Sequence, residues 1–449
     1  MNPLKRFPRL NSAWMEVKHR VAHWRARRER DLERDATVGD PRNVLVVVVD
    51  SLRADHVSAF GHERETTPAL DAFVDEARAF SNAKAPAPWT FPSIPSLLSG
   101  RYPHEHGGRM QGDPRNLAAA EFPTRPRESV PMLPDVLEAA GYDTAMFTAI
   151  PMAEKAAGDR FQRVSVTYTD ANERVAAARD WIRGRDRWLC HLQLGDPHAP
   201  LDVPDEHRET FDVPDVDGLE DWRYRESTDG EGFETYRDAR TRAYDAAIRG
   251  ADDALAALLD DVDDDTVVVV CGDHGEAFWE HVDVERRLND DPRGYYGTDH
   301  GHSVLEDVAR VPLWIRAPGV DSGVDDDPVS LTAVAPVVLD ALDAEVADGV
   351  DPAPLDVVRD ARPLLCEETN YGYNQRAVWV DDRKLVEVPA TGTRLAFDVA
   401  DGAEGDPLDD VPEDLVDALE GYGDGVEGEG AIDVDDETRD RLEELGYLE

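Results

Sequence analysis

Lysine is the scarcest charged residue in this chain of 449 residues. The five lysines are Lys5, Lys18, Lys84, Lys155 and Lys384, so arginine supplies the other 43 of the 48 basic residues. Against them stand 96 Asp and Glu, which give a formal net charge of −48 and are spread along the chain. This balance excludes nucleic-acid binding through bulk electrostatics. It is typical of a halophilic protein, because at molar salt the Debye length falls to about 3 Å and self-repulsion is screened; an ordinary acidic protein is the alternative.

Cysteines and long apolar runs are also scarce. The three cysteines, Cys190, Cys271 and Cys366, are odd in number and far apart, which excludes a disulfide framework and predicts buried thiols in a reducing compartment. No stretch approaches the roughly 20 apolar residues of a membrane span. No apolar signal region stands near the start either. We therefore expect a cytoplasmic protein.

Residues 1–40 differ from the rest in charge. Up to Asp35, ten Lys and Arg stand against five Asp and Glu, a local charge of +5. Apolar residues recur there at helical spacing: Trp14, Val17, Val21 and Trp24. This stripe predicts a basic N-terminal helical extension. Through residues 1–35 it would touch a membrane surface or a partner, or else pack on its own domain or on a second subunit.

Buried strands alternate with helices over residues 41–358. Val44–Val49 is a continuous β-branched run, typical of a buried parallel strand, and it ends in Asp50. Further strands are predicted at Thr144–Ala149, Trp188–Leu194, Thr266–Val270 and Val311–Ile315, and helices at Leu133–Ala140 and Asn172–Ile182. The alternation predicts an α/β domain with a mostly parallel central sheet and helices on both faces.

The pattern changes at about residue 359. Three short strands with turns between them are predicted at Ala377–Val380, Lys384–Val388 and Arg394–Val399, followed by a final helix at Asp436–Leu445. We therefore expect a smaller C-terminal α+β subdomain over residues 359–449.

Hard-metal ligands stand at the ends of two predicted strands. Asp50 ends the first, and Gly272-Asp273-His274-Gly275-Glu276 follows the strand at Thr266–Val270. Ligands of parallel sheets bind at the carboxyl ends of the strands, and carboxylate with imidazole can hold a divalent cation. One such acid alone would more often be a helix cap or turn residue. The Asp-His pair between two glycines favours a metal site.

Seven short sequence segments follow one another along the chain in a recognisable order. They are Asp50-Ser51-Leu52-Arg53-Ala54-Asp55-His56, Thr67-Pro68-Ala69-Leu70-Asp71, Leu97-Leu98-Ser99-Gly100-Arg101-Tyr102-Pro103, Asp196-Pro197-His198-Ala199-Pro200, Gly272-Asp273-His274-Gly275-Glu276, Arg310-Val311-Pro312-Leu313 and Leu445-Gly446-Tyr447-Leu448. Through these segments the chain resembles the sulfatase family of the alkaline phosphatase superfamily over roughly residues 43–449. It looks like haloarchaeal sulfatase-like hydrolases that carry Thr in place of the formylglycine precursor.

The resemblance implies a metal-dependent site. Its metal ligands would be Asp50, Thr90, Asp273 and His274 around one divalent ion, calcium by family, with Mn, Mg and Zn as alternatives. The catalytic residues would be Thr90, His198 and one of His300 and His302, because Asp299-His300-Gly301-His302 fits the family pattern in either register. His198, taken alone, could equally be a loop histidine. The implied substrate is an anionic ester, small or part of a glycan.

The departures from the family pattern bear on the chemistry. Counting back from Leu97-Leu98-Ser99-Gly100 places Thr90 at the family's Cys or Ser, which is converted to formylglycine, and threonine is no substrate for that conversion. The motif's Arg is Ile94, and the second of the family's paired aspartates is Ser51. The family's Gly-Lys-Trp segment is absent around Thr148-Ala149-Ile150. A second metal site is incomplete, because Asp196 is followed four places on by Pro200.

Three functions remain open at this point. The first is a sulfuric ester hydrolase acting on a saccharide or small organic ester, with Thr90 at the nucleophile position. The second is a phosphoester or phosphodiester hydrolase, or a phosphoglycerol-type transferase, that uses the hydroxyl of Thr90. The third is a non-catalytic binding member of the fold, which would predict loss of the metal ligands.

Overall fold

The computed structural model describes residues 35–442 with short gaps. The gaps are 111–121, 168–169, 202, 217–218, 220–227, 229, 348, 361–362, 424, 433, 435–437 and 440. The predicted stripe at Trp14–Trp24 and most of the predicted helix Asp436–Leu445 lie outside the described residues. Among the described residues, no helix is both long enough and apolar enough to cross a membrane. The three cysteines are buried and unpaired, as predicted.

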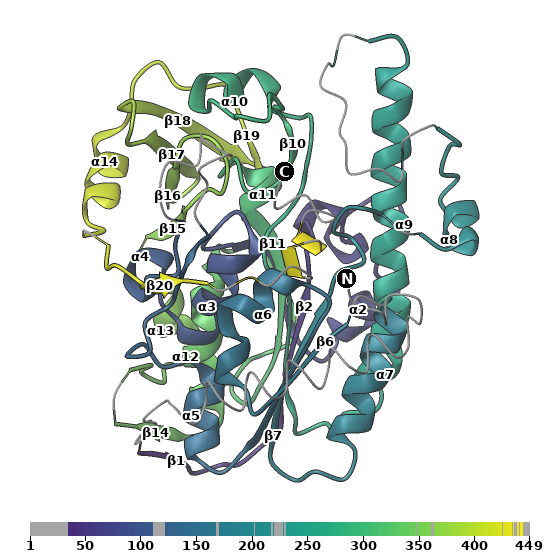
Figure 1. Ribbon diagram of the computed structural model, residues 1–449, viewed down its shortest axis with the longest axis vertical. Helices are drawn as coiled ribbons and strands as arrows, with labels where there is room; N and C mark the ends of the chain where they lie inside the picture. Colours follow the sequence, from purple (N-terminus) through teal and green to yellow (C-terminus); the bar gives the residue numbers. More distant parts are fainter. Residues whose placement is uncertain are drawn as a thin grey trace.

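A nine-stranded sheet forms the centre of the molecule (Figure 1). Its strands lie in the order β12-β3-β11-β8-β2-β7-β5-β6, and β13 also pairs with β3. Their bounds are β2 Val44–Val49, β3 Arg78–Lys84, β5 Asp143–Thr148, β6 Arg163–Val166, β7 Trp188–Leu194, β8 Val267–Gly272, β11 Arg310–Arg316, β12 Gly323–Asp325 and β13 Val329–Ser330. Strand β11 runs antiparallel to both of its neighbours, and the other pairings in this sheet are parallel. The predicted mostly parallel sheet is therefore confirmed.

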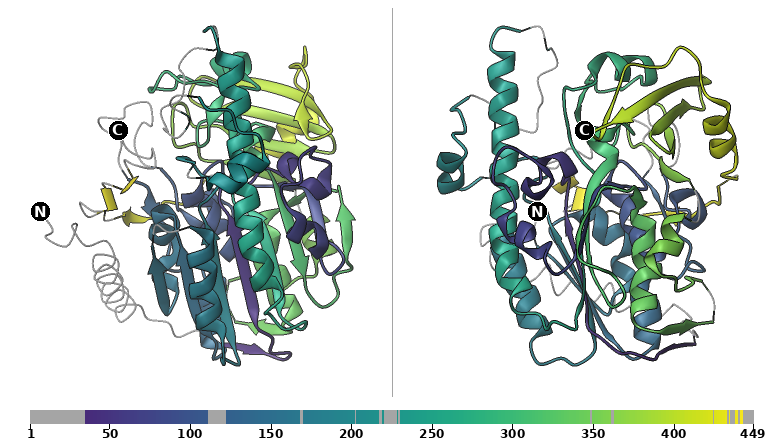
Figure 2. Two further views of the ribbon diagram at one scale, coloured as in Figure 1. Left: turned by 90° about the vertical axis from the view of Figure 1, so that its right-hand side faces the viewer. Right: turned by 180° about the vertical axis from the view of Figure 1, so that it is seen from behind.

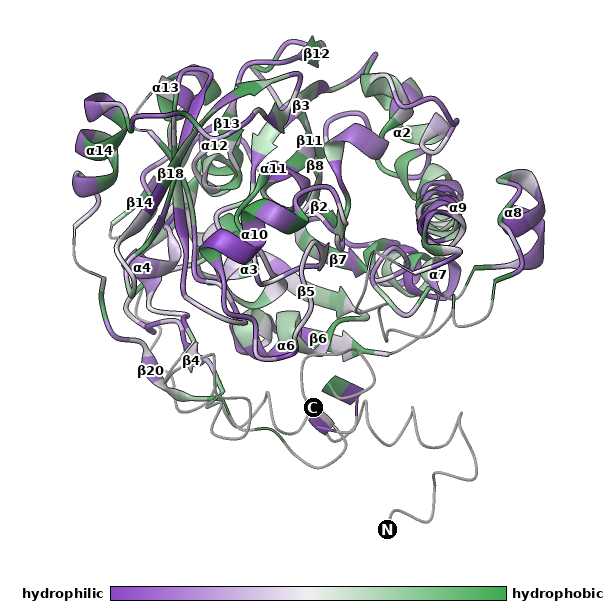
Figure 3. Ribbon diagram, turned by 90° about the horizontal axis from the view of Figure 1, so that it is seen from above, coloured by the Kyte–Doolittle hydropathy of each residue, from purple (hydrophilic) through white to green (hydrophobic). Residues whose placement is uncertain are grey.

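Helices cover both faces of this sheet, which is seen from above in Figure 3. One face carries α3 Thr90–Ser99, α5 Leu133–Ala139, α6 Pro151–Ala157 and α12 Val334–Ala341. The other face carries α2 Pro68–Phe73, α7 Ala171–Ile182 and α9 Phe233–Leu259. Alternate residues of the central strands supply the two cores, so Val46 and Val48 of β2 face the first group of helices and Leu45 and Val47 face the second.

The C-terminal part forms a second, antiparallel sheet of five strands, β15-β16-β17-β18-β19. Its strands are β15 Leu364–Glu367, β16 Arg376–Val380, β17 Arg383–Val388, β18 Thr393–Ala400 and β19 Ala403–Glu404. Helix α14, Glu413–Glu420, packs on one face, and residues from α10 Val282–Leu288 and α11 Glu306–Ala309 pack on the other. The two further views in Figure 2 show this sheet beside the end of the central sheet where α10 and α11 lie.

The remaining elements are short. They are β1 Ala36–Val38, α4 Pro103–His106, β4 Thr124–Arg125, α8 Asp205–Thr210, β9 Ala277–Phe278, β10 Thr298–Asp299, β14 Ala344–Val346, α13 Leu355–Asp360 and β20 Glu429–Ala431. Strand β1 pairs with β14, so the end of the predicted extension 1–40 joins the main domain. Helix α13 spans the predicted boundary at residue 359.

Candidate functional site

The candidate metal ligands meet where β2 and β8 end. These strands are parallel neighbours with Val49 opposite Gly272, so the next residue of each, Asp50 and Asp273, leaves the sheet at the same level. Possible ligand atoms of Asp50, Asp273 and His274 lie within 4.8 Å of one another, and all three side chains are fully buried. The structure thus brings together three of the residues that the sequence predicts.

Thr90 adds a hydroxyl group to this cluster. It is the first residue of α3, after Trp89 in an extended conformation, and it is fully buried. Its Oγ1 lies 3.2 Å from Asp50 Oδ2 and 3.2 Å from His274 Nε2. A hydroxyl group and three metal-ligand candidates therefore share one buried position.

Two glycines allow the backbone to pass through this position. A Cβ on Gly272 would stand 2.4 Å from the carbonyl oxygen of Leu52, and a Cβ on Gly275 would stand 2.2 Å from that of Asp307. Neither contact can be relieved by moving a flexible side chain, because each partner is backbone. The Gly-Asp-His-Gly spacing is thus required by close packing of the chain around the site.

Burial dominates the electrostatics of the cluster. It raises the pKa of Asp273 to about 7, and burial together with the charge of Asp273 raises the pKa of Asp50. Burial, with the neighbouring His300, lowers the pKa of His274 to about 3. Two buried carboxylates side by side are costly unless a positive charge neutralises them. The set of two carboxylates, a neutral imidazole and a hydroxyl therefore fits a divalent cation.

Gln193 is a member of this group that the sequence analysis missed. It comes from β7, the strand beside β2, and it is fully buried. Its Nε2 donates hydrogen bonds to Asp50 Oδ2 at 2.8 Å and to Asp273 Oδ2 at 3.3 Å. A signal did exist: His191 and Gln193 are polar residues at alternate positions of an otherwise apolar strand, Trp188–Leu194.

His300 and His198 lie beside the metal-ligand cluster. The ring centroid of His300 is 4.3 Å from that of His274 and 4.9 Å from that of His198. The Nδ1 atom of His300 lies 3.0 Å from Glu276 Oε2 and 3.2 Å from Asp299 Oδ1. Burial lowers the pKa of His300 to about 4 and, with the charge of Asp299, raises that of Glu276 to about 7.

This arrangement agrees with the sequence comparison. The chain matches the family model described as Sulfatase over residues 42–344. The chain belongs to the sulfatase family.

Two relatives show how far the sulfatase similarity extends. The "Ulvan-active sulfatase" of Formosa agariphila is 22% identical over 359 residues, which cover 69% of this chain and 63% of that protein. The "Low-salt glycan biosynthesis sulfotransferase Agl7" of Haloferax volcanii is 26% identical over 323 residues, again 69% of this chain and 63% of the relative. The chain thus spans less than two thirds of the length of either relative.

Solved sulfatase-like structures share the fold. One, solved in complex with its substrate D-glucosamine-2-N,6-O-disulfate, superposes with a TM-score of 0.61 at 16% identity. The match covers 80% of this chain and 91% of that one. At this identity the likeness supports the shared fold alone.

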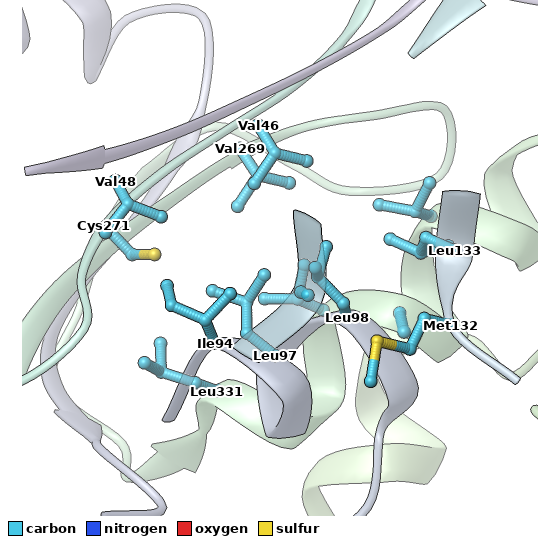
Figure 4. Packing of buried hydrophobic residues seen from close by; sticks show 14 of the residues in the cluster. Val46, Val48, Ile94, Leu97, Leu98, Met132, Leu133, Val269, Cys271 and Leu331 are labelled. Atoms are coloured by element: carbon cyan, nitrogen blue, oxygen red, sulfur yellow. The ribbon is translucent and has the colours of Figure 1, made fainter. Parts of the chain in front are cut away.

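Two departures from the sulfatase pattern now have structural explanations. Ile94, at the position of the family's Arg, is fully buried in the core, where Figure 4 shows it facing Val48 and Cys271. Ser51, at the position of the second aspartate, donates its hydroxyl to Asp50 Oδ1 at 3.2 Å. Ile94 therefore serves packing, and Ser51 supports a ligand candidate as a donor.

His302 lies apart from the cluster. Its Nε2 is 3.0 Å from Glu285 Oε2. Burial disfavours the charged ring, but the charge of Glu285 and the hydrogen bond to it outweigh this effect and raise the pKa of His302 to about 9. Within the described part of the chain, His302 makes no hydrogen bond to Thr90, Asp50 or Asp273.

The structure also brings together other possible ligands. Glu276, Asp299 and His300 form a second group beside the first, although Arg293 already pairs with Asp299. Asp196, the acid of the incomplete second site, accepts a hydrogen bond from the backbone of Ala171 at 3.1 Å and so caps α7.

Proposed function

We propose that this protein is a metal-dependent hydrolase that cleaves sulfate esters of a saccharide, with Thr90 at the nucleophile position. The observation that carries the proposal is the placing of Thr90 Oγ1 at 3.2 Å from both Asp50 and His274, in a chain of the sulfatase family. The buried carboxylates beside it supply the metal site that such chemistry needs.

One divalent ion would be held by Asp50, Asp273, His274 and Thr90. Calcium is the ion that the family resemblance implies, and the oxygen-rich donor set suits calcium, magnesium or manganese better than zinc. When bound, the ion supplies positive charge that neutralises the ester oxygens and lowers the pKa of the hydroxyl.

Side chains of the protein would attack the sulfur, protonate the departing oxygen and contact the anion. The hydroxyl of Thr90, which donates to Asp50, would attack the sulfur atom and pass its proton along that hydrogen bond. Water would then attack the same sulfur, so that sulfate leaves and the hydroxyl of Thr90 is restored. His300 would protonate the departing oxygen through Nε2 while its Nδ1 takes up the proton that Glu276 holds. His198, whose ring lies 4.9 Å from that of His300, would contact the anion. We assign no catalytic role to His302, because its ring is taken up by Glu285.

The substrate class rests on the relatives. One is named for activity on ulvan, and a protein of the same fold was solved with a disulfated glucosamine as its substrate. We extend that class to this chain and propose an anionic sulfated saccharide.

Transfer of a sulfuryl or phosphoryl group to an acceptor hydroxyl is the second candidate. Its specific support is the unmodified hydroxyl of Thr90, because a plain sulfate ester of threonine is stable toward water and would be released more readily to a positioned acceptor. A relative named as a sulfotransferase points the same way.

The experiment is a comparison of substrates on the full chain loaded with calcium or manganese. Sulfated mono- and oligosaccharides, a model phosphodiester and an unsulfated acceptor sugar are supplied to wild type, Thr90→Ser and Thr90→Ala. Hydrolysis would give free sulfate from a sulfated saccharide whether or not the acceptor sugar is present. Transfer would desulfate the donor only when the acceptor sugar is present and would give a sulfated acceptor without free sulfate, and a phosphodiesterase would act on the phosphodiester alone. Metal binding without turnover of any substrate would favour the non-catalytic alternative.

A further inference from the structure

The amide nitrogen of Gln193 faces both carboxylates of the cluster. Its Nε2 lies 2.8 Å from Asp50 Oδ2 and 3.3 Å from Asp273 Oδ2. These two carboxylates are the hardest ligands of the proposed metal site. The side chain of Gln193 therefore reaches the point where a cation shared by the two aspartates would lie.

The other end of the same amide is unsatisfied. Gln193 Oε1 is buried and makes no hydrogen bond of good geometry among the described residues, although burial lowers the pKa of His191 and an interaction between the side chains of Gln193 and His191 works against this effect. Leaving a buried carbonyl without a partner costs about 1–3 kcal/mol.

If the amide of Gln193 is turned over, its nitrogen faces a possible hydrogen-bond partner. His191 lies two residues earlier on the same face of β7, and both of its ring nitrogens are buried without a hydrogen-bond partner. A neutral imidazole offers one donor and one acceptor nitrogen, so His191 can pair with Oε1 in the observed orientation and with Nε2 in the turned one. The two ends of an amide have nearly the same size, so rotation about the Cγ–Cδ bond exchanges them without moving a neighbour.

The site has one carboxylate fewer than the paired aspartates of the family would supply. Ser51, which stands where the family has its second aspartate, donates to Asp50. We propose that Gln193 is a ligand of the metal ion: its amide turns so that Oε1 faces the cation held by Asp50 and Asp273 while Nε2 faces His191. This inference rests on the proposed metal site and adds to it a ligand from a third strand.

The proposal fits the charge of the site. Asp50 and Asp273 together carry two negative charges when ionised, which balance a divalent ion, and a neutral amide oxygen adds a ligand without adding charge. Amide carbonyls of Asn and Gln are ordinary ligands of calcium. If Gln193 acted as a donor alone, its removal should strengthen metal binding. The reason is that N–H groups bonded to the carboxylates compete with the cation for the same oxygens.

The experiment measures metal binding without reference to turnover. The full chain is stripped with a chelator, and calcium and manganese are titrated by calorimetry into wild type, Gln193→Leu and Gln193→Glu. Thermal unfolding of each stripped variant checks that it is folded. Gln375→Leu is the matched control, because Gln375 is also buried but donates to the carbonyl of His302.

A ligand role predicts that Gln193→Leu weakens binding at least about 10-fold while Gln193→Glu, which keeps an oxygen, binds as tightly as wild type or more tightly. In a crystal structure of the calcium-loaded protein, Gln193 Oε1 should lie about 2.3–2.6 Å from the ion. Unchanged or tighter binding by Gln193→Leu, or equal weakening in Leu and Glu variants, would overturn the proposal. Wild type that binds neither ion would instead refute the metal site itself.

Discussion

The Oγ1 atom of Thr90 lies 3.2 Å from Nε2 of His274, although 184 residues separate the two along the chain. Thr90 begins a helix that packs on the central sheet, and His274 follows β8 in the middle of that sheet. The contact therefore joins the proposed nucleophile to the proposed metal site through two rigid elements. Rigid elements hold reacting groups more accurately than loops do.

Replacement of Thr90 tests the nucleophile. We expect Thr90→Ala to lower turnover by at least about 10³-fold, because no other hydroxyl would form the covalent bond. Metal binding, measured by calorimetry, should weaken but stay measurable. Thr90→Ser keeps a hydroxyl and should retain most of the activity. Undiminished turnover in the alanine variant would disprove the assignment.

Glu276→Gln tests whether this carboxylate positions His300. Because burial raises the pKa of Glu276 to about 7, the Glu276–His300 pair holds a proton for the departing oxygen below that value, and activity should fall as the pH rises through about 7. In the glutamine variant this inflection should disappear and kcat should fall about 10-fold or more, with KM little changed. Metal affinity serves as the control, since Glu276 is not among the proposed ligands. A variant with an unaltered pH profile would rule out the positioning role.

His302 makes the stability of the protein depend on pH. Its pKa is raised from 6.5 to about 9 in the folded state by Glu285, so its stabilisation is fully present below about 6.5 and is lost as the pH rises through about 9. The loss should amount to between about 1 and 3 kcal/mol. Chemical denaturation of wild type and His302→Gln across this range measures it. The variant should lack this dependence; the same dependence in both proteins would contradict the account.

Two of the five lysines are buried around one carboxylate. Lys84 and Lys384 contact Glu306 at 2.5 Å and 3.2 Å, and all three side chains are buried. Glu306→Gln leaves two buried ammonium groups with one carboxylate fewer, so we expect a loss of about 3 kcal/mol in the free energy of unfolding. Arg383→Ala breaks the exposed pair with Asp414 and should cost less than about 1 kcal/mol. Equal losses in the free energy of unfolding would show that the buried network stabilises the protein no more than an exposed ion pair does.

The strands of the central sheet could be predicted because their apolar character can be read from consecutive residues. Val44–Val49 and Trp188–Leu194 have the predicted bounds, since both runs are mostly apolar and have the length of a buried strand. Strand β3, Arg78–Lys84, was missed, because its polar residues hide the pattern. The 27-residue helix Phe233–Leu259 was missed as well, because its many charged residues cover an apolar stripe.

The site could be predicted only in part, for a different reason. Asp50, Asp273 and His274 follow apolar runs, so their meeting at one edge of the sheet can be argued from the sequence. The choice between His300 and His302 cannot, because it depends on which ring Glu285 takes up. Glu276 and Gln193 act through side-chain contacts across strands, and the sequence does not encode those contacts in any local pattern.

The most direct test of the central claim is mass spectrometry of the metal-loaded protein, quenched during turnover of a sulfated saccharide. A sulfuryl and a phosphoryl group add nearly the same mass, so a phosphodiester is run in parallel at high mass accuracy and the adduct is located on peptides. The account predicts a sulfuryl group on the peptide that contains Thr90, absent in Thr90→Ala. Turnover by wild type with that peptide unmodified at every time point would contradict it and would assign the attack to water.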